Sequence, residues 1–174
     1  MSRRPLLFVD IDGVLNPIGP RCPPGFVEHD LPPIQDPVRV CALHSCWLHE
    51  LSQPFQLVWG SWWPETGREA LATVLDLPRF RGAVRRPGDY LTAPVWKVPV
   101  VAELAGARAL AWLDDQFTPG AWSWAEQRLE PTLLIPVTPD LGLSRDHVDR
   151  LLRWASLMSD GGDRPVDGSS DRSR

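Results

Sequence analysis

The sequence lacks a long apolar run, and its cysteines are few. No stretch approaches the roughly 18 uninterrupted apolar residues that cross a bilayer, so we expect no membrane protein. Arg3 and Arg4 before an apolar stretch imitate the start of a secretion signal, but Asp10 and Asp12 interrupt the apolar region. The three cysteines are an odd number without a secretory context, so we expect reduced thiols. Together these features predict a cytoplasmic protein with a mature N-terminus.

An excess of positive charge is also missing. The formal net charge is −4, which gives no overall attraction to a nucleic-acid backbone and argues against a nucleic-acid-binding module. The chain has 174 residues and no internal repeat, which favours one globular domain. Nothing in the sequence indicates an oligomeric state.

Four short apolar runs predict buried strands, because they are apolar throughout rather than alternating. They are Leu6–Val9, Gln56–Trp59, Ala109–Leu113 and Thr132–Ile135. Helical patterns are found at 42–52, 64–76, 99–106, 122–129 and 144–158, where Ser144 can cap the last helix. Strands that alternate with helices predict an α/β fold, a Rossmannoid three-layer α/β/α sandwich around a parallel sheet.

Two segments do not fit this alternation. The stretch 17–37 is rich in proline and too broken for a helix, so we expect a small flap at about 13–35. The segment 159–174 is polar and rich in Gly, Ser and Asp, which predicts a disordered tail. A single domain is therefore predicted over 1–158, without room for a large cap domain.

Two carboxylates follow the first predicted strand. In an extended backbone residues i and i+2 project the same way, so Asp10 and Asp12 can face one site while Ile11 packs on the other side. Gly13 lets the chain turn sharply after them. Two carboxylates against a core strand repel each other without a cation, which favours a metal site over a solvated strand end.

The next two strand ends also carry groups suited to phosphoryl chemistry. Gly60 and Ser61 offer backbone N–H groups and a hydroxyl that can hold a phosphate oxygen. Asp114 and Asp115 form a carboxylate pair suited to Mg²⁺, which is a hard, oxygen-seeking cation. Sites in open α/β sheets form at the carboxyl ends of strands, so these groups are expected to converge there.

The chain contains a single lysine among its 18 basic residues. Lys97 stands just ahead of a helix that Pro99 can begin. Because arginine serves every other cationic position, a lone lysine suggests a site that needs a compact ammonium. We therefore add Lys97 to the predicted site.

In type and order, these residues resemble the four motifs of the haloacid dehalogenase superfamily. Those motifs are an Asp-x-Asp strand end, a Ser or Thr strand end, a Lys and a terminal acidic pair. The matching residues are Asp10, Asp12, Ser61, Lys97, Asp114 and Asp115. The resemblance spans roughly 5–136. The second motif, Val58-Trp59-Gly60-Ser61-Trp62-Trp63, is similar to the Val-Trp-x-[Ser/Thr]-x-Trp form of small actinobacterial members without an assigned substrate.

The resemblance implies a Mg²⁺-dependent phosphohydrolase with an open site. Asp10 would attack phosphorus to give an aspartyl-phosphate, and Asp12 would protonate the leaving oxygen and then activate water. Mg²⁺ would be held by Asp10, by the Asp12 carbonyl and by either Asp114 or Asp115. Lys97 would neutralise the remaining charge. The residues expected to contact the phosphorylated substrate are Gly13, Gly60, Ser61 and Trp62.

Two other metal sites fit the sequence poorly. A calcium loop that begins Asp-x-Asp needs Gly at its sixth and Glu at its twelfth position, where this chain has Leu15 and Arg21. A possible zinc cluster consists of Cys41, His44, Cys46 and His49. Its spacing matches no common ligand pattern, so we interpret its members as core or surface residues.

Two alternatives to a general phosphatase remain. A regulatory protein could keep the metal site without turnover, but Asp12 favours an enzyme because a mere metal binder needs no general acid. A phosphatase for nucleic-acid ends would need a basic run to line the site, and the net negative charge argues against it. That run consists of Arg79, Arg81, Arg85 and Arg86, and solvated surface is its simpler interpretation. For Trp62 and Trp63 the alternatives are a core position and a substrate contact.

Overall fold

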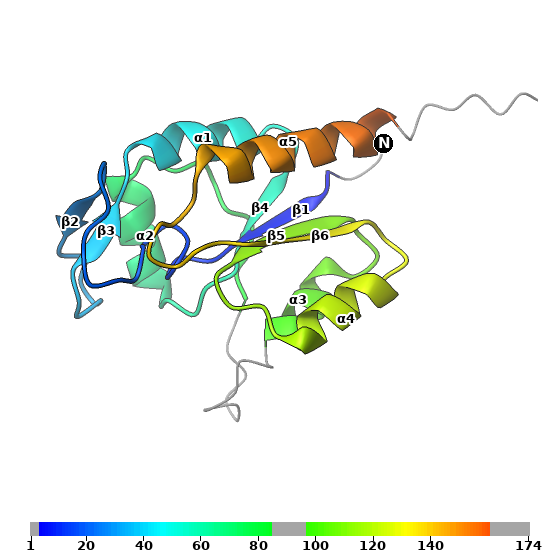
Figure 1. Cartoon of the computed structure of the whole chain (residues 1–174), viewed down its shortest axis with the longest axis horizontal. Helices are drawn as coiled ribbons and strands as arrows, with labels where there is room; N and C mark the ends of the chain where they lie inside the picture. Colours follow the sequence, from blue (N-terminus) through cyan, green and yellow to red (C-terminus); the bar gives the residue numbers. More distant parts are fainter. Residues whose placement is uncertain (1–3, 85–96, 161–174) are drawn as a thin grey trace, which may run out of the picture.

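The computed structural model describes residues 4–84 and 97–160, which form an α/β fold (Figure 1). The sheet has four strands in the order β4-β1-β5-β6, and all neighbouring pairs are parallel. These strands are β1 Leu6–Val9, β4 Gln56–Trp59, β5 Leu110–Asp114 and β6 Thr132–Pro136. The four predicted parallel strands are therefore confirmed, with β5 shifted by one residue and β6 longer by one. Strand β6 is only partly buried, in contrast to the prediction.

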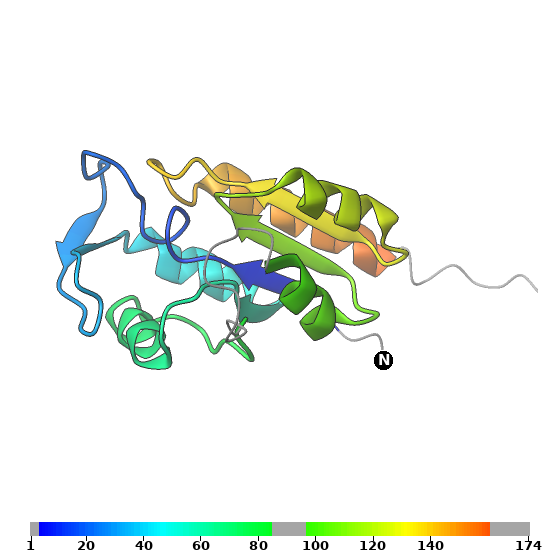
Figure 2. The ribbon, with the colours of Figure 1, turned by 90° about the horizontal axis from the view of Figure 1, so that it is seen from below.

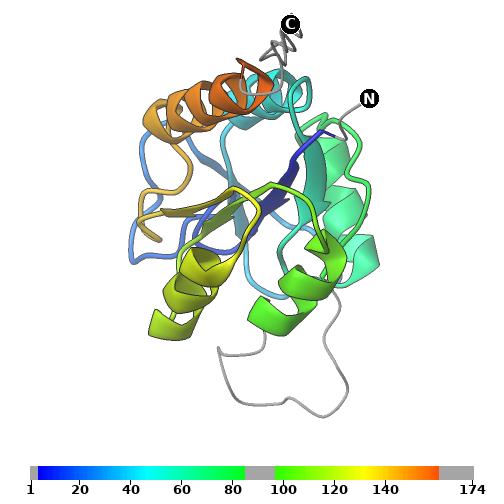
Figure 3. The same ribbon diagram turned by 90° about the vertical axis from the view of Figure 1, so that its right-hand side faces the viewer.

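Helices cover both faces of this sheet, as Figure 3 shows. They are α1 Leu43–Leu51, α2 Glu65–Val74, α3 Lys97–Ala105, α4 Pro119–Gln127 and α5 Arg145–Asp160. Side chains alternate along β1, so that Leu7 and Val9 pack in a core with α1, α2 and α5. Phe8 packs on the opposite face with α3 and α4. None of the described helices is long and apolar enough to cross a membrane.

Two helix starts differ from the sequence prediction by more than one residue. Helix α4 begins at Pro119, three residues early, because the Thr118 hydroxyl accepts a hydrogen bond from the Ala121 N–H at 3.3 Å and caps the helix. The prediction that Lys97 precedes its helix is wrong, since Lys97 is the first residue of α3. Pro99 is then the third residue, which is tolerated because the N–H groups of a first turn have no intrahelical partner.

The segment predicted as a flap contains strand β2 Val27–His29, which pairs with β3 Val38–Val40 in a two-stranded antiparallel ribbon. The sequence did not predict these strands, and β3 lies beyond the expected end of the flap at 35. Val38 and Val40 are buried against the main core. Figure 2 shows the ribbon at the end of the molecule toward which the strands of the sheet point. Of the predicted tail, 159–160 belong to α5 and 161–174 lie outside the described residues.

The strand order creates a crevice at the end of β1. The chain passes from β1 to β4 on one side and later to β5 on the other. The neighbouring strands β1 and β5 thus connect to opposite sides, β1 to β4 and β5 to β6, and α/β folds bind ligands at the carboxyl ends of two such strands. Asp10 is the residue that directly follows β1.

Candidate active site

A cavity of about 190 Å³ lies at the carboxyl ends of β1 and β4 and beside the start of α3. The predicted site residues that line it are Asp10, Asp12, Ser61, Trp62, Lys97 and Asp115. Ile18 and Gln116 complete the lining and were not predicted. The topology thus brings together residues that are far apart in the sequence.

Two predicted glycines make close backbone approaches near this cavity. Gly13 has a φ of 74°, and a Cβ there would lie 2.6 Å from Cγ of Asp115. A Cβ at Gly60 would lie 3.2 Å from the carbonyl carbon of Val9. Both glycines therefore let neighbouring chain segments approach the site closely. Neither one is among the residues that line the cavity.

Asp10 is almost completely buried, and both of its carboxylate oxygens have partners. Oδ1 accepts a hydrogen bond from the Ile11 N–H at 2.8 Å, and Oδ2 accepts one from Nζ of Lys97. Burial raises the pKa of the Asp10 carboxyl to about 7, although Lys97 opposes the rise and Asp114 adds to it. Additional positive charge beside Asp10 would favour its ionised form.

Lys97 joins two carboxylates. Its Nζ donates to Oδ2 of Asp10 and, at 2.6 Å, to Oδ2 of Asp114. Burial alone would lower the pKa of Lys97, but these two carboxylates hold it above its ordinary value. The side chain is therefore a charged ammonium that neutralises the site and does not act as a base.

The two aspartates at the end of β5 have different surroundings. Asp114 is fully buried. Its Oδ2 accepts hydrogen bonds from Lys97 and, at 3.1 Å, from the indole N–H of Trp112. Its Oδ1 accepts a hydrogen bond from the backbone N–H of Gln116 at 3.0 Å. Asp115 is half-buried and lines the cavity. Burial and the neighbouring Asp114 raise the pKa of the Asp115 carboxyl. Asp115 is therefore the aspartate of this pair that faces the cavity.

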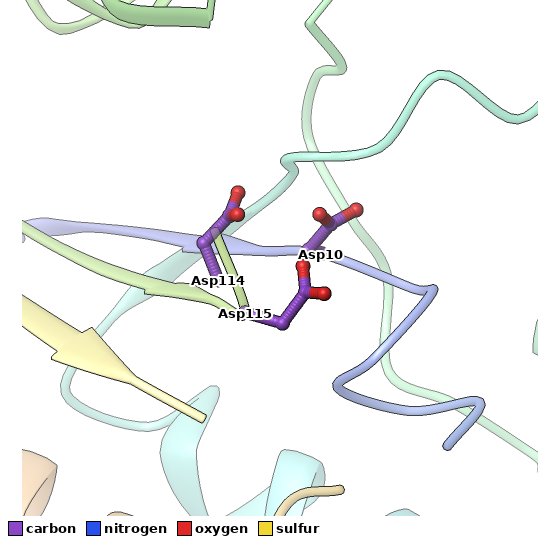
Figure 4. A group of neighbouring side chains, drawn as sticks. All are labelled: Asp10, Asp114 and Asp115. Carbon is purple, nitrogen blue, oxygen red and sulfur yellow. The ribbon is translucent and has the colours of Figure 1, made fainter. Parts of the chain in front are cut away.

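Three carboxylates lie close enough to hold one metal ion. One oxygen from each of Asp10, Asp114 and Asp115 lies within 4.8 Å of the others (Figure 4). This is the only group of three possible metal ligands of this kind in residues 4–84 and 97–160. A set of carboxylate oxygens suits Mg²⁺. The side chain of Asp12 is not part of the group.

Asp12 is held by two side chains whose role the sequence did not predict. Its Oδ1 accepts from Nδ2 of Asn16 at 2.9 Å, and its Oδ2 accepts from Nε1 of Trp63 at 2.8 Å. Trp63 ends the tryptophan-containing second motif, which was the only signal for it. Ser61 is buried, and its hydroxyl oxygen accepts from the Trp63 N–H at 3.3 Å. The Ser61 hydroxyl can still donate its own proton into the cavity.

The other patterns considered in the sequence lie away from this cavity. Arg79 and Arg81 line a separate cavity beside the start of β4, whereas Arg85 and Arg86 lie outside the described residues. The four residues of the possible zinc cluster, Cys41, His44, Cys46 and His49, do not form a metal-ligand group in the described chain.

Buried His44 packs against the rings of Phe26 and Trp47. Its Nε2 lies 3.4 Å from the Leu143 carbonyl oxygen, and its Nδ1 has no hydrogen-bond partner. Burial lowers the pKa of His44 to about 4. His44 is therefore a neutral core residue at physiological pH.

No model of a protein family matches the chain, and no curated protein matches it either. The chemical interpretation of the site therefore rests on the chain's own geometry. That geometry combines the Asp10 carboxylate, the Lys97 ammonium, the Ser61 hydroxyl and the Asp115 carboxylate around one cavity, with Asp114 buried behind Lys97. Such a set can bind a divalent cation together with a phosphate.

Proposed function

We propose that the protein is a Mg²⁺-dependent phosphomonoesterase of the haloacid dehalogenase type, with Asp10 as its nucleophile. The observation that carries this proposal is the meeting of Asp10, Lys97 and the Asp114-Asp115 pair at the carboxyl end of the sheet. The parallel order β4-β1-β5-β6 with helices on both faces supports a Rossmannoid sandwich of that type.

In the first half-reaction, a carboxylate oxygen of Asp10 attacks phosphorus, and the bond from phosphorus to the leaving oxygen breaks. The leaving oxygen keeps the electron pair of the broken bond and receives a proton from the Asp12 carboxyl. The Ser61 hydroxyl and the Lys97 ammonium face the same cavity and hold the phosphate oxygens. The product of this step is an aspartyl-phosphate at Asp10.

In the second half-reaction, Asp12 accepts a proton from water, whose oxygen attacks phosphorus and displaces the Asp10 carboxylate. Asp10 and Asp12 line one cavity, which permits the two side chains to act on the same phosphate. Mg²⁺ would offset the negative charge of the phosphate and of the carboxylates. The main chain of Asp12 would supply the further ligand that the family resemblance implies.

Asp115 is the better candidate for direct metal contact. Asp10 and Asp115 line the cavity, whereas Asp114 does not, and both oxygens of Asp114 accept hydrogen bonds from protein donors. The Oδ2 of Asp115 accepts a long hydrogen bond of 3.4 Å from the side-chain amide of Gln116. We therefore propose Asp10 and Asp115 as the carboxylate ligands. Asp114 holds Lys97 in place.

The substrate is proposed to be a phosphate monoester whose leaving group extends away from Asp10. A cavity of about 490 Å³ adjoins the first one, because Asp12 and Ile18 line both. This space gives the site room for a sizeable leaving group. A preference for nucleic-acid ends receives no support from Arg79 and Arg81, which line a different cavity.

The test is a phosphatase screen of the full chain on sugar phosphates, nucleotides, phosphopeptides and oligonucleotide ends. We expect hydrolysis with Mg²⁺ and loss of hydrolysis in excess chelator, with recovery when Mg²⁺ is restored. Full activity in chelator would refute the metal-dependent mechanism. If Mg²⁺ binds by calorimetry but no ester is hydrolysed, the regulatory alternative replaces the phosphatase.

A further inference from the structure

The two hydrogen bonds to Asp12 restrict a side chain that must both give and take a proton in the proposed mechanism. Trp63 Nε1 donates to Oδ2 at 2.8 Å, and Asn16 Nδ2 donates to Oδ1 at 2.9 Å. Both distances are those of well-formed hydrogen bonds. Each oxygen therefore has one N–H donor and keeps a second lone pair that can carry a proton. Rotation of the Asp12 carboxyl would break both bonds.

Each of the two donors is itself fixed. The amide oxygen of Asn16 accepts from the Arg39 N–H at 2.9 Å, and a backbone N–H can only donate. The NH₂ group of Asn16 must therefore face Asp12, which settles the orientation of this amide. Through Asn16, strand β3 of the ribbon is connected to Asp12.

The indole of Trp63 is held by close packing. Only 7% of its surface is exposed, and a Cβ at Gly67 in α2 would lie 3.3 Å from its Cε3. Helix α2 thus packs on the ring through a glycine. The indole N–H then has a fixed direction, and that direction is toward Asp12.

The place of these donors matches the side on which a leaving group would lie. Asp12, Asn16 and Trp63 all line the cavity of about 490 Å³ that adjoins the candidate active site. The oxygen that departs from phosphorus must reach Asp12 to receive its proton, so the rest of the leaving group extends into this cavity. Asp12 therefore lies where the two cavities meet.

A fixed general acid matters most when the leaving group is poor. An alkoxide is a strong base and departs only with a proton, whereas a nitrophenolate departs without one. We propose that Trp63 and Asn16 are positioning residues for Asp12, and that they adapt the site to phosphate esters of alkyl alcohols rather than of phenols. This inference rests on the proposed phosphatase function.

The test compares an alkyl ester, glycerol 1-phosphate, with an aryl ester, 4-nitrophenyl phosphate, at saturating Mg²⁺. Trp63→Phe keeps an aromatic ring and removes the N–H donor. We expect it to lower kcat/KM for the alkyl ester by at least roughly tenfold and for the aryl ester by less than about threefold. Asn16→Ala should likewise lower kcat/KM more for the alkyl ester than for the aryl ester, and we call this difference the imbalance between the two esters.

Trp154→Phe is the matched control. Trp154 lies on α5, stacks on Phe55 with ring centroids 6.0 Å apart, and lines neither cavity. We expect no imbalance between the two esters for this variant. Thermal melts of all variants show whether a loss of activity reflects a loss of folded protein.

A second measurement examines the contact itself without turnover. In ¹H–¹⁵N spectra, the indole N–H signal of Trp63 is identified by its absence in Trp63→Phe. We expect this signal to move and to exchange faster with solvent in Asp12→Ala, because its acceptor is gone. An unchanged signal would overturn the inference.

The outcomes for the inference and for the proposed function differ. Equal losses on both esters, or no loss on either, would overturn the positioning role while the phosphatase function stands. If the wild type hydrolyses neither these two esters nor any ester of the phosphatase screen, the proposed function fails, and the positioning role falls with it. A selective loss on the alkyl ester supports both.

Discussion

Replacement of Lys97 by methionine tests the central ion pair of the site. The change keeps the apolar stem of the side chain and removes the ammonium that joins Asp10 and Asp114. Oxygens of these two carboxylates lie within 4.8 Å of each other. At an effective dielectric constant of about 20, two unit charges at that separation repel by about 3.5 kcal/mol. In the wild type the ammonium offsets this repulsion.

A phosphate that enters the Lys97→Met site meets two uncompensated carboxylates. If the whole of that repulsion opposes the transition state, kcat/KM falls about three-hundredfold, since 1.4 kcal/mol corresponds to a factor of ten. Lys97→Arg should recover little of this loss, because the planar guanidinium is larger and cannot occupy the same point between two carboxylates.

The assay is kcat/KM on the best substrate found, at saturating Mg²⁺, with thermal melts of each variant. Folded Lys97→Met protein with a near-wild-type rate would remove Lys97 from the mechanism. A rate for Lys97→Arg close to that of the wild type would show that the site needs only a positive charge and not a compact one. Trp154→Phe again serves as a control away from the cavity.

Three further predictions have distinct expected outcomes. Asp10→Asn should abolish turnover without unfolding the protein, because the amide keeps the shape of the side chain but cannot attack phosphorus; a phospho-enzyme trapped from this variant and detected by mass spectrometry would place the nucleophile elsewhere. Asp115→Asn should raise the Mg²⁺ concentration needed for half-maximal activity, with little change in Tm. Asp114→Asn should lower Tm, because it breaks the buried pair with Lys97. If Asp114→Asn instead raises the Mg²⁺ requirement and Asp115→Asn lowers Tm, the metal ligand is Asp114. Stability should fall between pH 6.5 and about 4 by about 3 kcal/mol through His44, since the unfolded state binds a proton there that the folded state excludes. Denaturant unfolding across this range should show a smaller pH dependence for His44→Phe, and an unchanged dependence would exclude His44 as the cause.

The sequence predicted the parallel strands well for a physical reason. A strand buried on both faces must be apolar at every position, so β1 and β5 are visible as continuous runs. The ribbon strands β2 and β3 have only three residues each, within a proline-rich segment, and such short strands leave no periodic signal.

The candidate site was predictable where chemistry restricts the residue type at a strand end. Asp10 and Asp114 were found in this way, whereas Lys97 was found as the only lysine of the chain. The structure brings the three side chains into contact. The contact from Trp63 to Asp12 was not predictable, because it joins residues 51 positions apart and depends on packing against α2. A tryptophan in a sequence does not reveal where its N–H points.

Because the chain has a single lysine, a protease that cleaves only after lysine has one cleavage site in it. That site is the bond after Lys97, within the first turn of α3 and beside the Asp10 carboxylate. Cleavage requires local unfolding of this turn, so the digestion rate reports the population of the locally unfolded state around Lys97. A ligand that stabilises the closed arrangement slows the cut, and one gel band then reports binding without any knowledge of the substrate.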